Sequence, residues 1–124
     1  MSQRPTDAEL AILKVLWDLG PATVRDVHAK LCEVKQVAYT TILRFMQIML
    51  EKGLVHRDDS SRAHVFSAAL TEESVQRNML RHLVKTAFRD SPGQLVMRAL
   101  ADKDTSREEL DAIRNMLDDL EEPK

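Results

Sequence analysis

The order of segments within residues 1–70 constrains the fold more than any other feature of the sequence. Thr6 and Glu9 form a capping box ahead of an apolar stripe with helical spacing, and Gly20-Pro21 ends that segment. A second capping box, from Thr23 to Asp26, opens a shorter helix. The chain is therefore expected to begin with two short amphipathic helices.

A third amphipathic segment runs from about Ala38 to Lys52 and is ended by Gly53. Its apolar residues recur at i, i+3, i+4, i+7 and i+8, which places them on one face of a helix. Two short β-prone runs follow, at 54–57 and 63–66, and a polar, turn-forming stretch separates them. Three helices followed by a hairpin is the order of a winged helix-turn-helix domain.

Composition excludes several classes of protein. With 44% hydrophobic and 31% charged residues, and only 3 Gly and 4 Pro, the chain is expected to be globular and rich in helix rather than disordered or fibrous. The single cysteine, Cys32, cannot form an internal disulfide or a Cys-rich zinc site, and it is interpreted as a small helix residue rather than a redox sensor. Neither an export signal nor a stretch of the ~20 apolar residues needed to span a membrane is recognised, which predicts a cytoplasmic protein.

The second half of the chain predicts three more amphipathic helices. Thr71 caps the first, which extends to about Arg89, Ser91-Pro92 opens the second, and Ser106 caps the third. The expected fold is mostly α with a small β-hairpin: a winged-helix DNA-binding domain over residues 1–70 and a helical dimerisation region over residues 71–124.

These C-terminal helices have more apolar surface than three helices can bury among themselves. A homodimer is therefore predicted, and the alternative is packing against the N-terminal domain of the same chain. The residues expected at the dimer interface are Leu83, Phe88, Leu95, Leu110, Ile113, Leu117 and Leu120.

The helix at 38–52, about 22 Å long at 1.5 Å per residue, fits the major groove of DNA. Thr40 and Thr41 allow close approach to bases or phosphates, Arg44 can bind a guanine edge, and Tyr39 can place its hydroxyl on a phosphate. The stretch from Val34 to Leu50 contains no acidic residue, and Lys35 lies within it and is also predicted to contact DNA. A solvated helix face is the alternative, but the position of the helix before the hairpin favours DNA recognition.

Charge is distributed unevenly. The net charge of −2 by itself argues against DNA binding, yet residues 1–70 carry 9 basic and 8 acidic side chains, whereas residues 71–124 carry 9 and 12. Arg57 and Arg62 flank the expected hairpin tip and are predicted to contact DNA as a wing. The alternative is an ordinary polar turn, because Asp58 and Asp59 would repel phosphate.

No pattern indicates catalysis, a metal or a cofactor. The four histidines lack a metal-binding spacing, and phosphate-binding and nucleophile motifs are missing from the sequence. His56 and His64 could oppose each other across the hairpin, but two imidazoles alone make a poor metal site.

Several short motifs are spread over much of the chain: Thr6-Asp7-Ala8-Glu9-Leu10, Val15-Leu16-Trp17, Ala22-Thr23-Val24-Arg25-Asp26-Val27, Ala38-Tyr39-Thr40-Thr41-Ile42, Lys52-Gly53-Leu54-Val55 and Arg62-Ala63-His64-Val65-Phe66. Together they resemble the penicillinase repressor family of BlaI/MecI type, and the resemblance covers nearly the whole chain. It implies a bacterial winged-helix repressor that dimerises through its C-terminal helices and binds a palindromic operator ahead of β-lactam-resistance or stress genes. In that family the third helix enters the major groove, which by position places Tyr39, Thr40, Thr41 and Arg44 at the DNA.

The resemblance also implies a partner. Repressors of the family are inactivated when a membrane sensor protease responds to β-lactam and an Asn-Phe bond in the dimerisation half is cut. Arg98-Ala99 occupies that position here, so the same cleavage site is not expected. The C-terminal cysteines of the copper-responsive branch are missing, which disfavours copper sensing. The competing function is a winged-helix module that binds another protein.

Overall fold

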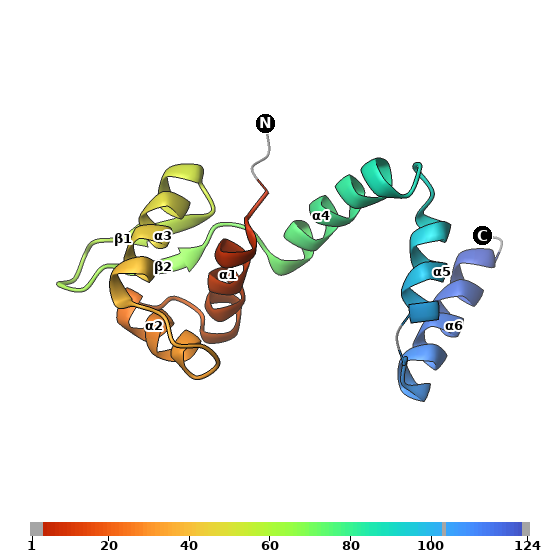
Figure 1. Cartoon of the computed structure of the whole chain (residues 1–124), viewed down its shortest axis with the longest axis horizontal. Helices are drawn as coiled ribbons and strands as arrows, with labels where there is room; N and C mark the ends of the chain where they lie inside the picture. The colour runs from red at the N-terminus through yellow and green to blue at the C-terminus, as the bar shows by residue number, and fades with distance from the viewer. Residues whose placement is uncertain (1–3, 103, 123–124) are drawn as a thin grey trace. The chain divides into compact units, whose positions relative to one another are not determined.

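The structure is a computed structural model, and it describes residues 4–102 and 104–122. Six helices and one two-stranded antiparallel sheet make up this part of the chain, as predicted (Figure 1). In chain order they are α1 (Asp7–Leu19), α2 (Val24–Cys32), α3 (Tyr39–Lys52), β1 (Val55–Asp58), β2 (Val65–Ala68), α4 (Glu72–Ala87), α5 (Pro92–Asp102) and α6 (Arg107–Glu121).

The chain divides into two compact units, Met1–Leu80 and Arg81–Lys124. The sequence placed the boundary after residue 70, and two features keep the start of α4 with the first unit. Val75 is only 2% exposed, and the indole Nε1 of Trp17 on α1 donates a hydrogen bond of 2.9 Å to the carbonyl oxygen of Leu70. The first unit therefore extends into α4.

Local capping fixes where the helices begin. Both predicted capping boxes are present: the Thr6 hydroxyl accepts from the Glu9 N–H at 3.2 Å, and the Thr23 hydroxyl accepts from the Asp26 N–H at 3.1 Å. Gly53 ends α3 in the left-handed conformation with φ 80°, which a residue without Cβ adopts at little cost. The predicted caps of the later helices are also present: the hydroxyl oxygens of Thr71, Ser91 and Ser106 each accept the backbone N–H of the residue three positions later.

One core joins α1, α2, α3 and the hairpin. Each helix contributes the apolar stripe that its periodicity predicts, and Phe66 of β2 is 2% exposed within the same cluster. The hairpin is also tied to the turn between α1 and α2, because Ala22 and Phe66 exchange two backbone hydrogen bonds of 2.9 and 2.8 Å. The core includes Ile12, Leu13, Leu16, Val27, Ile42, Met46, Met49, Leu54 and Val55.

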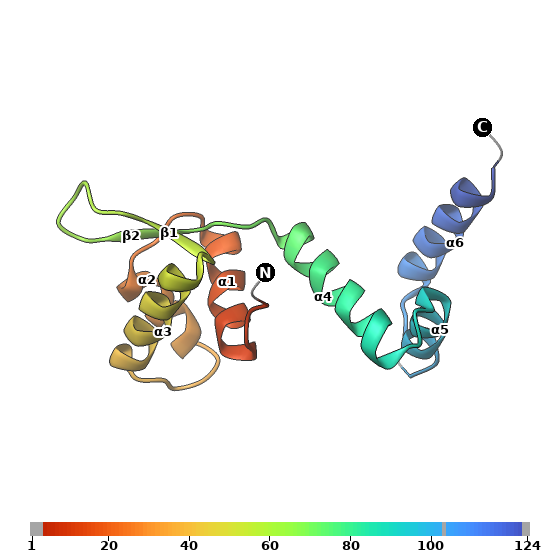
Figure 2. The same cartoon turned by 90° about the horizontal axis from the view of Figure 1, so that it is seen from above.

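The hairpin projects beyond the three helices, which lie on one side of it (Figure 2). Its register pairs Val55 with Ala68 and Asp58 with Val65. His56 therefore faces Ser67, and the predicted opposition of His56 and His64 is wrong. The turn is longer than expected because the Asp58 carboxylate accepts the Ser60 N–H at 2.9 Å, which holds residues beyond β1 out of the strand.

The second unit contains the end of α4 and the helices α5 and α6. The predicted extension of α4 to Arg89 is too long by two residues, because Arg89 and Asp90 adopt positive φ angles of 50° and 61°. The described residues include no helix that is both long enough and apolar enough to cross a membrane.

Candidate nucleic-acid interface

Helix α3 separates cleanly into a buried and an open face. Ile42, Met46 and Met49 are at most 3% exposed and pack into the core. On the opposite face Thr40 and Arg44 are exposed, as are Thr41 and Gln47. The predicted recognition face is therefore not covered by other described parts of the protein.

The N-terminal end of α3 carries no side-chain cap. Ala38 occupies the cap position, and the first turn contains no acidic residue. The first N–H groups of a helix have no acceptor within the helix, and the helix dipole places partial positive charge there. This end of α3 can therefore donate hydrogen bonds to an anion from outside the helix.

His28 supports the same end of α3 from α2. Its Nε2 donates a hydrogen bond of 2.7 Å to the carbonyl oxygen of Val37, and its ring meets Tyr39 edge-on with centroids 5.6 Å apart. The Sγ of Cys32 lies 3.3 Å from the same nitrogen. In the sequence His28 lacks the spacing of a metal ligand, and no motif there indicates another role for it. Nothing local in the sequence signals its contact with Tyr39, because the turn between the helices brings the two together.

A groove of about 640 Å³ lies between the start of α2, the open side of α3 and the hairpin. Its lining includes Arg25 and Gln47, which are not among the predicted site residues. Arg25 lies within the second capping box, where the sequence pattern indicates only the start of a helix. Three predicted residues also line this groove: Tyr39, Arg57 and Arg62.

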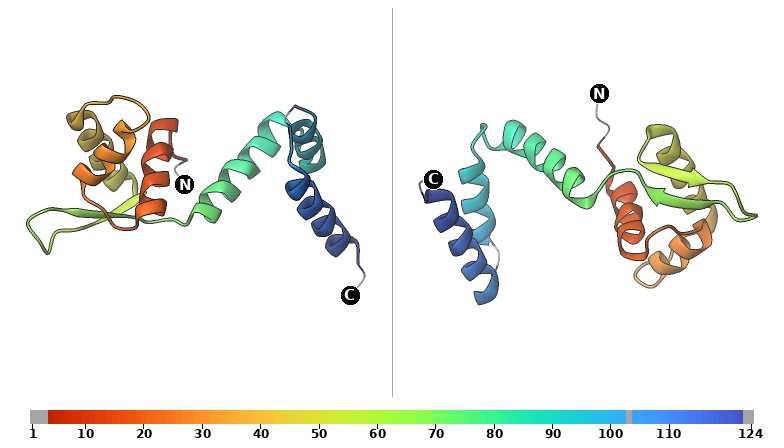
Figure 3. Two further views of the ribbon diagram at one scale, coloured as in Figure 1. Left: turned by 90° about the horizontal axis from the view of Figure 1, so that it is seen from below. Right: turned by 180° about the vertical axis from the view of Figure 1, so that it is seen from behind.

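The other predicted DNA-binding residues lie outside the groove lining. Thr40, Thr41 and Arg44 are exposed on α3, and Lys35 is exposed in the turn that precedes it. Figure 3 shows the hairpin and the three helices from two further sides. The seven predicted residues thus come from three consecutive parts of the first unit: the turn before α3, α3 itself and the hairpin.

The hairpin carries an internal ion-pair network. One carboxylate oxygen of Asp59 accepts from Arg57 Nε at 2.8 Å and from His64 Nδ1 at 2.5 Å. Slight desolvation raises the pKa of Asp59, but the hydrogen bonds from His64 and Arg57 outweigh it and hold the pKa below its ordinary value. Arg57 is therefore partly neutralised within the protein. No ion pair of Arg62 is found in the described part of the chain.

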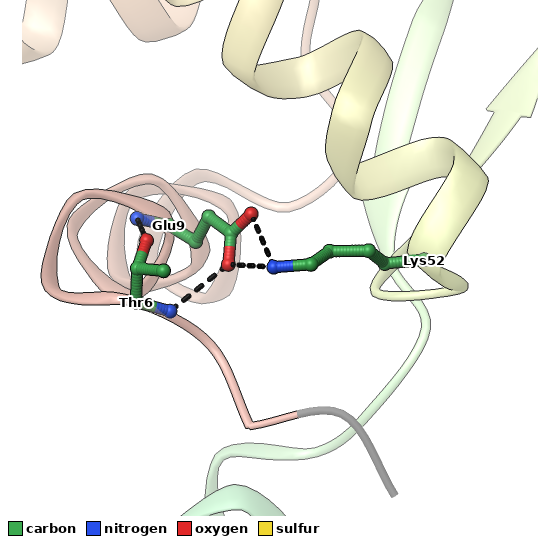
Figure 4. A network of polar contacts seen from close by, with 3 residues as sticks. All are labelled: Thr6, Glu9 and Lys52. Atoms are coloured by element: carbon green, nitrogen blue, oxygen red, sulfur yellow. Dashed lines mark hydrogen bonds and ion pairs between the residues drawn. The ribbon is translucent and has the colours of Figure 1, made fainter. Parts of the chain in front are cut away.

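A buried ion pair ties the other end of α3 to α1 (Figure 4). Lys52 Nζ donates to both carboxylate oxygens of Glu9, at 2.9 and 3.0 Å, and the Thr6 N–H donates to one of them at 2.9 Å. The Glu9 side chain is 3% exposed and that of Lys52 is 25% exposed. The capping pattern predicts the role of Glu9 at the start of α1, but Lys52 lies 43 positions away and no local pattern indicates its contact with Glu9.

The charge on Glu9 makes stability depend on acid pH. Burial raises the pKa of Glu9, but the Thr6 N–H and the Lys52 ammonium together hold it below its ordinary value of 4.5. The carboxylate therefore stabilises the fold above pH 4.5, and this contribution is lost as the pH falls through the lower pKa of the folded state. We expect Glu9→Gln to lower the melting temperature more at pH 7 than at pH 3.5, measured by circular dichroism. An equal loss at both values would contradict this assignment.

The apolar residues of the second unit are exposed or half-buried in the single chain. None of the residues of α5 or α6, all of which the structure describes, is buried. Leu83, Leu117 and Leu120 are 45%, 52% and 72% exposed. The remaining residues predicted at the dimer interface are half-buried: Phe88, Leu95, Leu110 and Ile113.

Among the residues that the structure describes, no three His, Cys, Asp or Glu side chains are grouped so that they could hold a metal ion.

Three helices, an antiparallel hairpin and the bridge from Ala22 to Phe66 define the first unit as a winged helix-turn-helix domain. Two solved structures share this fold. Bacillus licheniformis BlaI, solved as a monomeric form in complex with the blaP half-operator, has a TM-score of 0.52 at 22% identity and covers 59% of this chain and 89% of its own. The DNA-binding domain of the repressor BlaI has a TM-score of 0.51 at 24% identity, with 58% and 90% covered.

The family model described as penicillinase repressor matches residues 5–119, and the chain belongs to this family. The transcriptional regulator BlaI of Mycobacterium tuberculosis is 28% identical over 116 residues, which is 93% of this chain and 83% of that protein. The methicillin resistance regulatory protein MecI of Staphylococcus aureus is 17% identical over 112 residues, with 90% and 91% covered. The family consists of transcriptional repressors and not of enzymes, so the predicted family, fold and non-enzymatic class are confirmed.

Proposed function

We propose that this repressor binds a palindromic DNA operator as a homodimer, with residues 1–70 reading DNA and residues 71–124 forming the dimer. The observation that carries the proposal is the open polar face of α3 beside a groove lined by arginines of α2 and the hairpin. A helix of 14 residues, about 21 Å long at 1.5 Å per residue, fits the major groove. The resolved complex of BlaI with a half-operator supports DNA as the ligand.

In this proposal α3 reads bases and its surroundings bind phosphates. Thr40 and Arg44 are one turn apart on the open face, where the guanidinium can make two hydrogen bonds to a guanine. Tyr39, Thr41 and Lys35 lie at the uncapped end of α3, where N–H groups and positive charge favour backbone phosphates.

The wing binds the DNA backbone next to that helix. Arg62 offers a full positive charge, whereas Arg57 already shares Asp59 with His64. Arg25 extends the basic lining of the groove to the start of α2. We infer that Arg62 and Arg25 supply more phosphate affinity than Arg57.

The dimer is supported by the apolar residues that the second unit leaves exposed. A two-fold axis presents two α3 helices to two half-sites, which makes the operator an inverted repeat. The regulated genes are proposed to serve β-lactam resistance or the response to cell-envelope stress. A sensor protease is the proposed inducing partner, and Arg98 and Ala99 are both exposed on α5.

The test begins by selecting, from a randomised library, a DNA duplex that the wild-type chain binds; this is the enriched duplex, and a scrambled version of its sequence is the comparison. The salt dependence of binding to each duplex is then measured. A DNA-binding repressor loses affinity linearly in log salt, with a slope of about −0.9 for each phosphate neutralised. Arg62→Ala is expected to reduce the magnitude of the slope by about one, equally for the enriched and a scrambled duplex. Arg114→Ala, which removes an arginine paired with Asp111 on α6, is the matched control and should leave the slope unchanged.

Two results would count against the proposed function. A wild-type chain that enriches no sequence and shows no salt-dependent binding would favour the protein-interaction module instead. An Arg62→Ala variant with the wild-type slope would remove the wing from the proposed interface.

A further inference from the structure

Methionine makes up much of the deeply buried apolar surface of α3. Two of its three buried side chains are Met46 and Met49, and the third is Ile42. Methionine has three rotatable bonds and no branching, so it fills a core while tolerating small shifts of the element that carries it. Leu43, Phe45 and Leu50 pack half-buried against the same core. A directional polar contact at one end of α3 therefore adds a sharper constraint on the tilt of the helix than the methionines supply.

The two ends of α3 differ in how they are held. At the N-terminal end Ala38 offers no side-chain cap, and the neighbouring support comes from the edge-on His28 ring. At the C-terminal end Lys52 binds both oxygens of a carboxylate that is itself fixed by the Thr6 N–H. Three hydrogen bonds from these two donor groups reach an almost fully buried carboxylate, so the geometry at this end is closely defined.

The contact at Lys52 also lies where α3 turns into the hairpin. Gly53 ends the helix, and Leu54 then donates to the Met49 carbonyl at 2.9 Å and accepts from Ala69 at 2.9 Å. A shift of Lys52 would therefore move the helix relative to the wing. Thr40 is 12 residues away, about 18 Å at 1.5 Å per residue, so a tilt of about 5° at Lys52 displaces it by about 1.5 Å. Base-edge hydrogen bonds do not survive a displacement of that size.

We infer that Glu9 and Lys52 are positioning residues that set the orientation of α3 relative to the hairpin, so that discrimination between operator and other DNA depends on them although neither lies in the DNA-binding surface. The inference rests on the proposed function. Contacts to phosphate tolerate a shift because they are spread along the backbone and carry no sequence information. Loss of the pair therefore lowers specificity more than it lowers general affinity for DNA.

The experiment uses the full chain with Lys52→Met and Glu9→Gln. The control is Val75→Ala, which opens a buried site on α4 outside the core cluster that contains α3. Binding to the enriched and the scrambled duplex is measured by fluorescence anisotropy, at a temperature at which circular dichroism shows every variant folded. We expect the ratio of the two affinities to fall about tenfold in Lys52→Met and at least threefold in Glu9→Gln, and to stay within twofold of wild type in Val75→Ala.

Two features of the design separate positioning from charge and from stability. The two substitutions change net charge in opposite directions, so a shared loss of specificity cannot come from charge. In the double variant the ratio of the two affinities should fall no further than in Lys52→Met alone, because both changes remove the same contact. If the ratio of the two affinities is the same in Lys52→Met as in Val75→Ala, the inference is overturned.

A second measurement needs no DNA. The ratio of amide hydrogen-exchange rates in α3 to those in α2 should rise in Lys52→Met and stay unchanged in Val75→Ala. The reason is that only the Lys52→Met substitution releases the C-terminal end of α3. If the wild-type chain enriches no sequence, the proposed function fails, and the exchange pattern still decides the positioning role. An unchanged exchange ratio in Lys52→Met would overturn that role.

Discussion

Leu117→Glu is expected to convert the proposed dimer into a monomer and to weaken binding to a two-half-site operator by about 10²- to 10⁴-fold. Leu117 is 52% exposed on α6, next to the half-buried Ile113 and the 72% exposed Leu120. A carboxylate placed in an apolar interface loses its hydrating water without gaining a hydrogen-bond partner. The free energy that this desolvation costs exceeds the free energy of association that a small interface provides. Binding of the two half-sites then becomes independent, and the gain from linking them is lost.

Analytical ultracentrifugation and anisotropy on a two-half-site duplex measure the two effects. Asn115→Glu is the matched control, because it adds the same charge to the same helix at an exposed polar position, about half a turn from Leu117. Affinity for a single half-site should stay at the wild-type value in both variants. A Leu117→Glu variant that sediments as a dimer would place the interface elsewhere.

Arg44→Ala is expected to weaken binding to the enriched duplex by about 1–3 kcal/mol, a factor of roughly 5 to 150, with little effect on a scrambled duplex. Arg44 is exposed on the open face of α3, one turn from Thr40. In the proposed complex, truncation of Arg44 would remove two hydrogen bonds to a base edge and relax the preference at that base pair.

The comparison needs a control for lost charge. Lys14→Ala removes one positive charge from an exposed position on α1, outside the proposed interface, and should change binding to both duplexes only slightly. Isothermal binding curves at fixed salt give the two affinities for each variant. Equal losses on both duplexes in Arg44→Ala would make Arg44 a phosphate contact and not a base reader.

Features encoded within a few residues of one another could be predicted from the sequence. The capping boxes at Thr6 and Thr23, the end of α3 at Gly53 and the buried stripe of each early helix depend on local hydrogen bonds and on periodicity, and all are present. The exposed face of α3 follows from the same periodicity. The family resemblance depends on the same short motifs.

Features that depend on the packing of distant segments could not be predicted. The hairpin register pairs His56 with Ser67, and Asp58 and Asp59 make hydrogen bonds with Ser60 and His64 in the turn. The β-prone runs in the sequence do not indicate these turn contacts, so they do not place His56 and His64 correctly. The contact of His28 with Tyr39 requires the turn between α2 and α3 to be folded. Glu9 satisfies its capping pattern without Lys52, and nothing in that pattern indicates a second partner.

The missing cap on α3 has a thermodynamic consequence for the domain as a whole. A threonine at the cap position of α1 and of α2 satisfies a backbone donor, whereas Ala38 occupies the cap position of α3. A serine or aspartate there would add about 1 kcal/mol of stability. This end of α3 is the one that we propose to contact DNA, and there the uncapped N–H groups stay available to a phosphate. The free domain is then less stable than a capped one, and binding of a phosphate at this end would stabilise it more.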